Sequence, residues 1–290
     1  MLLIADGGST KTNWCVIDSK GQRSYFNSEG YNPYFVDSDY IVASLSKVLP
    51  GNLNKEAVSS IYFYGAGIQN REKASVLVDA FKVIFSNSQA CVEHDLLASA
   101  RALLGFEAGF AAILGTGTNS CLYNGTEIIH HIDSGAHVLG DEGSGFYIGK
   151  RLLIDYLRGA MPEELHKSFK AEYNLTSDEV HEAVYSKPLA NRYCAGFSRF
   201  IADNYNDFEY SRNLLKAAFN DLFKNIISLY PDYQQYKFNC IGSVGHHFQD
   251  ILKEVATEWG MEIGKILQAP LDGLVEYHLA KIASEEKIEQ

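Results

Sequence analysis

The chain has 290 residues, 46% of them hydrophobic, which is enough to build one large or two medium globular domains with substantial cores. Acidic residues outnumber Lys and Arg by 36 to 25, and the resulting net charge of −11 argues against nucleic acid and anionic membranes as partners. The lack of a signal-peptide pattern and of a long apolar run, together with five scattered cysteines, predicts a cytoplasmic protein with reduced thiols.

The N-terminal region is predicted to be an antiparallel meander followed by alternating strands and helices. Apolar, β-rich runs at 2–5, 12–17 and 23–28 predict three strands, and the SKGQ segment at 19–22 predicts the second turn. Further along, the pattern predicts helices over 41–49, 71–85 and 96–104 and strands over 60–65 and 90–93.

A second copy of the meander begins near residue 110. Residues 111–114 predict a strand and 115–118 a turn. Asn124-Gly125 is a strong hairpin signal, here between predicted strands over 119–123 and 127–132. The order of strand, polar loop, strand, turn and strand matches that at the N-terminus, which predicts a duplicated fold.

The chain is then predicted to be mostly helical from 149 to 231. The clearest helix has one apolar face, formed by Leu214, Leu215, Ala218, Phe219, Leu222, Phe223, Ile226 and Ile227. After it we expect a strand over 238–243, a helix marked by the apolar residues from Phe248 to Trp259, a break at 268–271 and a last helix over 273–284. The tail at 285–290 is expected to fray.

The polar loop after the first strand is a candidate phosphate site. Glycines let the backbone approach phosphates closely, and successive N–H groups and hydroxyls supply donors. A P-loop is excluded, because Thr10 rather than Gly precedes Lys11 and β-type sequence follows. An ordinary tight turn is the alternative. The candidate phosphate-binding residues are Gly7, Gly8, Ser9, Thr10, Lys11 and Thr12, and Asp6 at the strand end is the candidate Mg²⁺ ligand, directly or through water.

A second loop of the same kind follows the first strand of the second copy. Its candidate phosphate-binding residues are Gly115, Thr116, Gly117 and Thr118. A single GTGT is a weak signal. Two such loops in a repeated meander predict that one polyphosphate is held from both sides, which makes a nucleotide-dependent phosphotransferase the leading hypothesis.

Asp95 lies where a predicted strand gives way to a helix. A carboxylate there can accept the proton of an attacking hydroxyl while a nucleotide delivers its terminal phosphoryl group. Asp is also a common helix N-cap, and position alone favours that role. The two roles are compatible, because a cap would hold the carboxylate in place.

Two glycine-flanked segments in the second half are further candidates. Asp141 and Glu142, in GDEGSG, have side chains suited to the hydroxyls of a sugar, and a solvated loop with a helix cap is the alternative. Gly242, Ser243 and Gly245, in IGSVG, would let an adenosine lie against the backbone, and a plain strand–helix turn is the alternative.

Together these motifs resemble those of the sugar kinase/Hsp70/actin ATPase superfamily, in particular its BadF/BadG/BcrA/BcrD-type branch, and within that branch the N-acetylglucosamine kinases. The resemblance covers nearly the whole chain in order: DGGSTKTNWCVID and LGTGTNSC as phosphate motifs, YNPYF as a sugar-contacting segment, HDLLASARAL as the catalytic segment, GDEGSGFYIG as a branch signature and IGSVG as the adenosine motif. It implies ATP with Mg²⁺, an amino sugar phosphorylated on its 6-hydroxyl, and a homodimer.

The resemblance also implies roles and domain limits. Asp95 would be the catalytic base, and the substrate residues would be Asn32, Asp95, Thr118, Asn119, Asp141 and Glu142, with Thr118 and Asn119 on the N-acetyl side. The implied fold is α/β, with two ribonuclease H-like (actin-like ATPase) domains at 1–109 and 110–271. Each would be a mixed five-stranded sheet with flanking helices, with an interdomain cleft, and the C-terminal helix near 272–285 would pack back on the first domain.

Two other functions stay open at this point. One is an ATPase that activates a 2-hydroxyacyl-CoA dehydratase-type enzyme, which needs cysteines placed for an iron–sulfur cluster, and the five cysteines do not form that set. The other is a catalytically silent sugar or nucleotide sensor. The presence of both Asp6 and Asp95 argues against it.

Overall fold

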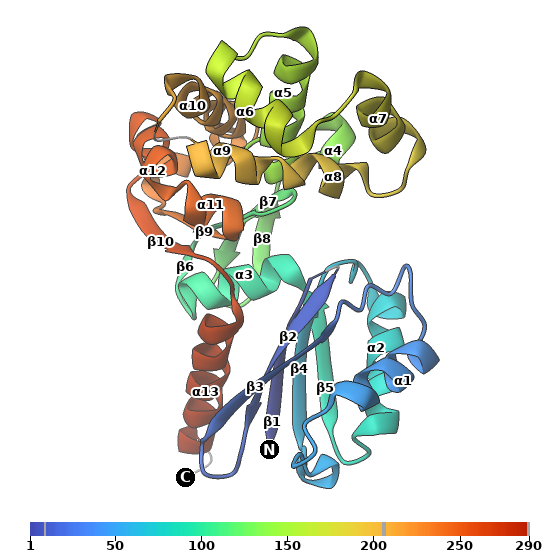
Figure 1. Ribbon diagram of the computed structural model, residues 1–290. Helices are drawn as coiled ribbons and strands as arrows, with labels where there is room; N and C mark the ends of the chain where they lie inside the picture. Colours follow the sequence, from blue (N-terminus) through green and yellow to red (C-terminus); the bar gives the residue numbers. More distant parts are fainter. Residues whose placement is uncertain (9, 205–206, 289–290) are drawn as a thin grey trace. The chain divides into compact units, whose positions relative to one another are not determined.

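The computed structural model describes residues 1–8, 10–204 and 207–288 (Figure 1). The chain divides into two compact units: unit 1 comprises Met1–Phe106 and Pro270–Gln290, and unit 2 comprises Glu107–Ala269. Each unit has its own mixed five-stranded sheet with flanking helices and its own buried core. The predicted α/β fold with two such sheets is therefore confirmed.

The sheet of unit 1 has the strand order β3-β2-β1-β4-β5. Its first three strands form the predicted antiparallel meander, whereas β1, β4 and β5 run parallel to one another. The central strand β1 is buried along most of its length, which explains its continuous apolar run. The strands are β1 Leu2–Gly7, β2 Lys11–Ile17, β3 Arg23–Glu29, β4 Ser60–Gly65 and β5 Gln89–His94.

Two pairs of helices cover this sheet. Helices α1 and α2 contact each other, α3 contacts α13, and Figure 1 shows the two pairs on opposite faces. On the α1–α2 side, Trp14, Phe63 and Phe81 form an aromatic cluster with ring centroids 5.5 to 5.8 Å apart. The helices are α1 Ser38–Val48, η1 Lys55–Ala57, α2 Arg71–Ile84, α3 Asp95–Leu104 and α13 Leu271–Ile288.

The C-terminal helix α13 packs on the sheet of unit 1 through both charged and buried contacts. Arg23 Nη1 lies 2.8 Å from Glu276 Oε1, and the Tyr64 hydroxyl lies 2.8 Å from Nε2 of His278. Burial lowers the pKa of His278 to about 3, so its imidazole is neutral. The helix continues to Ile288, beyond the predicted end at 284, and residues 289–290 of the tail that was expected to fray lie outside the described residues. A Lys281–Glu285 ion pair at 3.9 Å supports these last turns.

The sheet of unit 2 repeats the topology of unit 1. Its order β10-β9-β6-β7-β8 matches that of unit 1 when β6 is aligned with β1. The predicted Asn124-Gly125 hairpin is present, with φ of +97° at Gly125. Strand β10 was not predicted, because its sequence IGKIL is short, only partly buried and interrupted by Gly and Lys. The strands are β6 Ala108–Leu114, β7 Thr118–Asn124, β8 Ile128–His131, β9 Phe238–Ile241 and β10 Ile263–Leu267.

Most of unit 2 outside the sheet is helical, as predicted. The eight apolar positions assigned to one helix face are all buried, although α10 ends at Asn225. The strand expected to reach Ser243 ends at Ile241, and Ser243 begins α11. The helices are α4 Ala136–Leu139, α5 Gly145–Arg158, α6 Glu163–Tyr173, α7 Ser177–His181, η2 Glu182–Ser186, α8 Ala190–Gly196, α9 Ser198–Asn204, α10 Glu209–Asn225, η3 Ile227–Leu229, η4 Tyr233–Gln235, α11 Ser243–His247 and α12 Gln249–Glu258. None of the described helices combines the length and apolarity needed to cross a bilayer.

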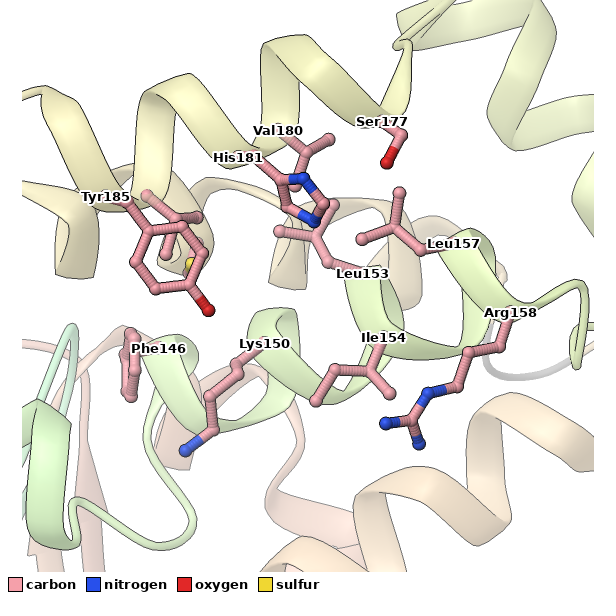
Figure 2. Close-up of a pocket in the computed structure, with 12 residues that line it drawn as sticks. Phe146, Lys150, Leu153, Ile154, Leu157, Arg158, Ser177, Val180, His181 and Tyr185 are labelled. Atoms are coloured by element: carbon pink, nitrogen blue, oxygen red, sulfur yellow. The ribbon is translucent and has the colours of Figure 1, made fainter.

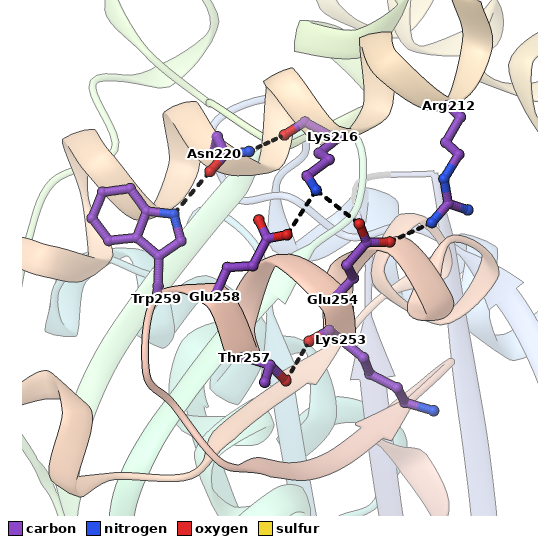
Figure 3. Close-up of polar contacts among 8 residues, drawn as sticks. All are labelled: Arg212, Lys216, Asn220, Lys253, Glu254, Thr257, Glu258 and Trp259. Atoms are coloured by element: carbon purple, nitrogen blue, oxygen red, sulfur yellow. Dashed lines mark hydrogen bonds and ion pairs between the residues drawn. The ribbon is translucent and has the colours of Figure 1, made fainter. Parts of the chain in front are cut away.

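A polar network joins α10 to α12 on the surface of unit 2 (Figure 3). Lys216 Nζ lies 2.8 Å from Glu254 and 2.7 Å from Glu258, and Arg212 pairs with the other oxygen of Glu254. Next to it the indole N–H of Trp259 donates to Asn220 Oδ1 at 2.9 Å. The network fixes the two helices to each other at a point where both are partly exposed.

Candidate functional site

The parallel register of unit 1 brings the candidate residues of that unit to one edge of the sheet. Gly7 pairs with Gly65, and Gly65 pairs with His94, so the carboxyl ends of β1, β4 and β5 are level. In open α/β sheets this edge is where ligands bind. Asp6 and Asp95 both lie there.

Both carboxylates have raised pKa values. Burial, followed by the charge of Asp95, raises the pKa of Asp6 to about 6, and a hydrogen bond from the Asn13 side chain opposes the shift. Burial also raises the pKa of Asp95, opposed by His94 and by the backbone N–H groups of Leu96 and Asp95 itself. Two neighbouring acids with raised pKa values favour binding of a cation or a proton.

Asp95 is not a helix N-cap, so that interpretation was wrong. The cap of α3 is His94, whose Nδ1 accepts a hydrogen bond from the Leu97 N–H at 3.2 Å. Asp95 is the first residue of the helix itself. Its carboxylate is therefore not used as the cap, and it sits where the positive end of a helix favours negative charge.

The first loop is a tight connection with several exposed groups. Its ends meet where the Gly8 N–H donates to the Lys11 carbonyl at 2.9 Å, and a β-carbon at Gly7 would lie 2.6 Å from Phe63 Cζ. Gly8, Thr10 and Lys11 are exposed. The buried hydroxyl of Thr12 instead donates to the Glu29 carbonyl at 3.0 Å. Ser9 lies outside the described residues.

Asn32 is held against the turn that follows β4. Its Oδ1 accepts the Tyr34 N–H at 3.0 Å. Gly67 has φ of +82°, and a β-carbon there would overlap the Asn32 carboxamide. Only glycine fits this contact, and it joins the YNPYF segment to the turn beyond Gly65. Asn32 and Asp95 thus both belong to unit 1, at segments that adjoin the β4 end.

The second loop is fixed by the helix that follows it. The first amides of α5 donate to the loop, from Gly145 N to the Gly115 carbonyl at 2.8 Å and from Phe146 N to the Thr116 carbonyl at 3.0 Å. Across the loop, Gly115 N donates to Gly117 at 3.1 Å. The N-terminus of α5 therefore holds the loop in shape. Two of its first N–H groups, which have no acceptor within the helix, are used in these hydrogen bonds.

Asp141 is buried and accepts a hydrogen bond from the second loop, so its own segment is not the solvated loop of the alternative interpretation. Its Oδ1 accepts the Thr118 N–H and the Ser134 hydroxyl, each at 3.1 Å, and the side chain of Thr118 donates to the Glu142 carbonyl at 2.7 Å. Asp141 is 7% exposed, and burial raises its pKa against these hydrogen bonds. Its φ of +59° marks a constrained backbone.

Other expected substrate residues of unit 2 have protein partners as well. The Glu142 carboxylate accepts from Asn225 Nδ2 at 2.9 Å. Asn119 Oδ1 accepts the Ser120 N–H at 3.0 Å and lies 2.9 Å from His131 Nε2. These contacts give Asp141 and Glu142 a structural role in the segment before α5.

The IGSVG segment packs its glycines tightly. Gly242 has φ of +131°, its N–H donates to the Leu267 carbonyl at 3.0 Å, and a β-carbon on it would overlap the Leu114 carbonyl. A β-carbon on Gly245 would overlap the Cys240 sulfur. These glycines bring the turn against the end of β6, where the second loop begins.

A cavity of about 590 Å³ adjoins this turn. Ser243 and Val244 line one side of it, and Arg199 and Asp203 of α9 and Gln268 line others. Its size is within the roughly 300 to 1,000 Å³ typical of small-molecule sites. No local sequence pattern indicated Arg199, Asp203 or Gln268, because the fold brings them together from helix α9 and from the segment after β10.

Comparison with known proteins places the chain among sugar kinases. No profile of a known protein family matches the sequence. The crystal structure of a provisionally named N-acetylglucosamine kinase from Porphyromonas gingivalis is 38% identical, with a TM-score of 0.89, and the match covers 96% of this chain and 98% of that one. A ROK family glucokinase from Streptomyces griseus, solved with glucose and AMPPNP, shares the fold at 16% identity and a TM-score of 0.56, over 94% and 97% of the two chains.

A curated relative gives a shorter match. The N-acetyl-D-glucosamine kinase of Dictyostelium discoideum is 26% identical over 168 residues, which are 53% of this chain and 53% of that protein. The matched region thus spans about half the length of the curated relative.

Proposed function

Because the chain belongs to the N-acetylglucosamine kinase family of the sugar kinase/Hsp70/actin superfamily, we propose that it transfers the γ-phosphoryl group of ATP to the 6-hydroxyl of N-acetylglucosamine or a related amino sugar. The observation that carries the proposal is the pair of carboxylates, Asp6 and Asp95, at the carboxyl edge of the unit 1 sheet, with raised pKa values. Asn32, beside the neighbouring turn, offers a carboxamide to a sugar hydroxyl.

Asp95 is the proposed general base. It accepts the proton of the sugar 6-hydroxyl as that oxygen attacks the γ-phosphorus, and the bond from the γ-phosphorus to the β,γ-bridging oxygen breaks to release ADP. A raised pKa makes this carboxylate a better proton acceptor than an ordinary one. Little covalent chemistry falls to the protein, so most of the catalysis is positioning and charge stabilisation.

We assign the nucleotide mainly to unit 2. The second loop, in which Thr116 is exposed and Gly115 and Gly117 are half-buried, would bind phosphate oxygens. The cavity beside Ser243 would take the adenosine. The glycines at 242 and 245 act by letting this turn approach the loop. Asp141 then serves as a positioning residue for the loop, which modifies its sequence-based role as a sugar ligand. In unit 1, Gly8, Thr10 and Lys11 are the exposed loop residues available to phosphates.

The residues of unit 1 fit a hard divalent cation. Asp6 supplies a carboxylate oxygen, and its pKa is raised first by burial and then by the negative charge of Asp95. Mg²⁺ would be held there through one carboxylate, water and the phosphates of the nucleotide. Bound there, Mg²⁺ would neutralise charge on the phosphoryl groups.

The iron–sulfur activator has less support. Cys15, Cys121, Cys194 and Cys240 are buried, and only Cys91 of the five cysteines is exposed. A cluster shared between two chains needs exposed thiolates from each. A homodimer without such a cluster remains part of the proposal, and light scattering from the purified chain tests it.

The test is ATP consumption by the purified chain with a panel of acceptors. With Mg²⁺ present, ADP release is measured with N-acetylglucosamine, N-acetylmannosamine, N-acetylmuramic acid, glucosamine, glucose and no sugar. We expect release that depends on one amino sugar, matched by an equal amount of sugar phosphate. ATP hydrolysis at the same rate with and without sugar would favour an ATPase activator. No turnover with any acceptor would favour a sensor.

A further inference from the structure

A second cavity of unit 2 lies between α5 and the segment formed by α7 and η2. Its volume is about 510 Å³, within the roughly 300 to 1,000 Å³ typical of small-molecule sites. Figure 2 shows the side chains of α5 on one side and those of α7 and η2 on the other. None of the phosphate-binding, adenosine-binding, substrate or metal residues assigned above lines it.

The cavity is rich in positive charge. Lys150 and Arg158 line it, and no Asp or Glu is among its lining residues. Within the described part of the chain, neither Lys150 nor Arg158 forms an ion pair. The chain as a whole has a net charge of −11. Two cations left without acidic partners at one cavity of such a protein create a local positive potential that favours an anion.

The same cavity has an apolar floor. Leu153 and Val180, each 3% exposed, lie beneath it, and Ile154 and Val184 complete the lining between the charged groups. Lys150, Ile154 and Arg158 follow one another at intervals of four residues along α5, so the two cations flank an apolar side chain on one helix face (Figure 2). An anion that fills this space must therefore carry an apolar body.

The lysine is held in place by aromatic rings. Its ammonium lies 4.9 Å from the centroid of the Phe146 ring and 5.1 Å from that of Tyr147. Cation–π contacts of this kind restrain the side chain without neutralising its charge. The cation is thus partly ordered before any ligand arrives, which lowers the entropic cost of binding.

The wall opposite α5 has an irregular backbone. Segment η2 is a π-helix, closed by a hydrogen bond from Lys187 N to the Glu182 carbonyl at 3.1 Å, and Leu189 just after it has φ of +64°. Its Tyr185 is 83% exposed although the ring faces the cavity. Isolated π-helical turns and left-handed non-glycine residues are costly and are found most often at functional sites.

We propose that this cavity is a binding site for a small amphipathic anion. The apolar body of the ligand lies on Leu153 and Val180, and its acidic group, a carboxylate, phosphate or sulfonate, is attracted by the positive potential of Lys150 and Arg158, which lie on either side of Ile154. The site is distinct from the kinase chemistry proposed above and does not depend on it.

The probe for the test is 1-anilinonaphthalene-8-sulfonate, an apolar fluorophore with one sulfonate. We titrate it into the full chain and into Lys150→Gln, Arg158→Gln and Lys170→Gln. The last is the matched control, an exposed lysine of α6 outside the cavity. We expect saturable binding of one probe per chain, weakened about tenfold by each of the first two substitutions and unchanged in the control. Octanoate displaces the probe, whereas octanol does so only at much higher concentration.

Equal affinity in all four proteins would overturn the proposal, and so would equal displacement by octanol and octanoate, because either result would reduce the site to an apolar cavity. Arg158 is exposed, so its substitution leaves the fold intact and keeps the test decisive if the Lys150 variant is unstable. Val184→Phe provides a second line of evidence. A larger side chain in the lining should abolish saturable probe binding, and unchanged binding would place the probe elsewhere.

Discussion

The two units share one strand order and use the same edge of the sheet in different ways. Unit 1 places two carboxylates, Asp6 and Asp95, at its strand ends and leaves them with raised pKa values. Both units have glycines at or just after these strand ends, but unit 2 buries one carboxylate, Asp141, under two hydrogen bonds. A duplicated fold can thus supply the same loop twice while a pair of carboxylates with raised pKa values occurs in only one copy.

The loops themselves are fixed by a shared device. In each unit a buried threonine stands near the start of the second strand, and its hydroxyl donates to a backbone carbonyl, Thr12 to Glu29 at 3.0 Å and Thr118 to Glu142 at 2.7 Å. These hydrogen bonds fix the end of each loop where the second strand begins. The difference between the units therefore lies in the side chains beside the loops, and substitutions there should separate chemistry from nucleotide binding.

The largest effect is expected for Asp95→Asn. The amide keeps the shape of the side chain but cannot accept the proton, so kcat should fall by about 10²- to 10⁴-fold. Nucleotide affinity should stay within about twofold, because the nucleotide is assigned mainly to unit 2. Steady-state kinetics and a nucleotide-binding titration measure the two quantities, with the exposed Asp39→Asn as the control. Near-normal kcat would remove Asp95 from the role of base.

The Asp6→Asn variant tests whether the pKa of Asp6 is raised on folding, because such a shift makes the free energy of unfolding depend on pH. The pKa of Asp6 rises from 3.8 to about 6 on folding, so the folded chain takes up a proton between these pH values. The free energy of unfolding contributed by Asp6 therefore falls as pH rises from about 4 to about 6, and stays low above 6. The substitution should stabilise the chain at pH 7.5 by on the order of 2 kcal/mol.

The same substitution should have almost no effect on stability near pH 3, where Asp6 is largely protonated in both the folded and the unfolded state. Urea unfolding at the two pH values, without Mg²⁺, measures the difference. An equal loss of stability at both pH values would show that the pKa of Asp6 is not raised on folding. With Mg²⁺ and ATP, the variant should also lose turnover, because the proposed metal ligand is gone.

Asp141→Asn tests the support of the second loop. The carboxamide retains one acceptor for Thr118 N but loses the charge, so we expect a loss of stability of about 1 to 2 kcal/mol. The KM for ATP should rise several-fold while kcat changes less. Urea unfolding and steady-state kinetics at varied ATP measure both. A fall in kcat as large as that of Asp95→Asn, with KM unchanged, would return Asp141 to a direct catalytic or sugar-binding role.

The smallest effect is expected at the surface network of unit 2. Lys216→Met removes the cation shared by Glu254 and Glu258, but the pairs are partly exposed and screened. We expect a change in the melting temperature within about 2 °C, reduced further in high salt. Differential scanning calorimetry at two salt concentrations measures it. A large, salt-independent loss would mean that the α10–α12 contact matters more than its exposure indicates.

Local patterns were sufficient for most of the fold. The meander of β1 to β3, the Asn124-Gly125 hairpin and the apolar face of α10 each depend on short-range periodicity or turn chemistry, and the structure has all of them. Strand β10 was missed because pairing with β9, not its own sequence, makes it a strand. The cap at His94 was missed because histidine is an unusual N-cap.

The site was predictable only where it is local. Runs of glycine and hydroxyl-bearing residues were enough to predict both loops, and the junction of a predicted strand with a predicted helix was enough to single out Asp95. The hydrogen bond from Thr118 N–H to Asp141 spans 23 residues, and the cavity residues Arg199 and Gln268 come from distant segments, so no local pattern joins them. Asn13 illustrates the limit, because only the register of β1 and β2 places it opposite Asp6.

The most direct test of the central claim is phosphorus NMR of the reaction of the unmodified chain with Mg²⁺-ATP and N-acetylglucosamine, alongside its 6-deoxy analogue. We expect a new phosphomonoester signal, coupled to the protons on carbon 6, to grow as ATP is consumed, and no such product from the analogue. Inorganic phosphate formed equally with both sugars, or a phosphoester at another carbon, would contradict the assignment of this chain as a kinase for the 6-hydroxyl of an amino sugar.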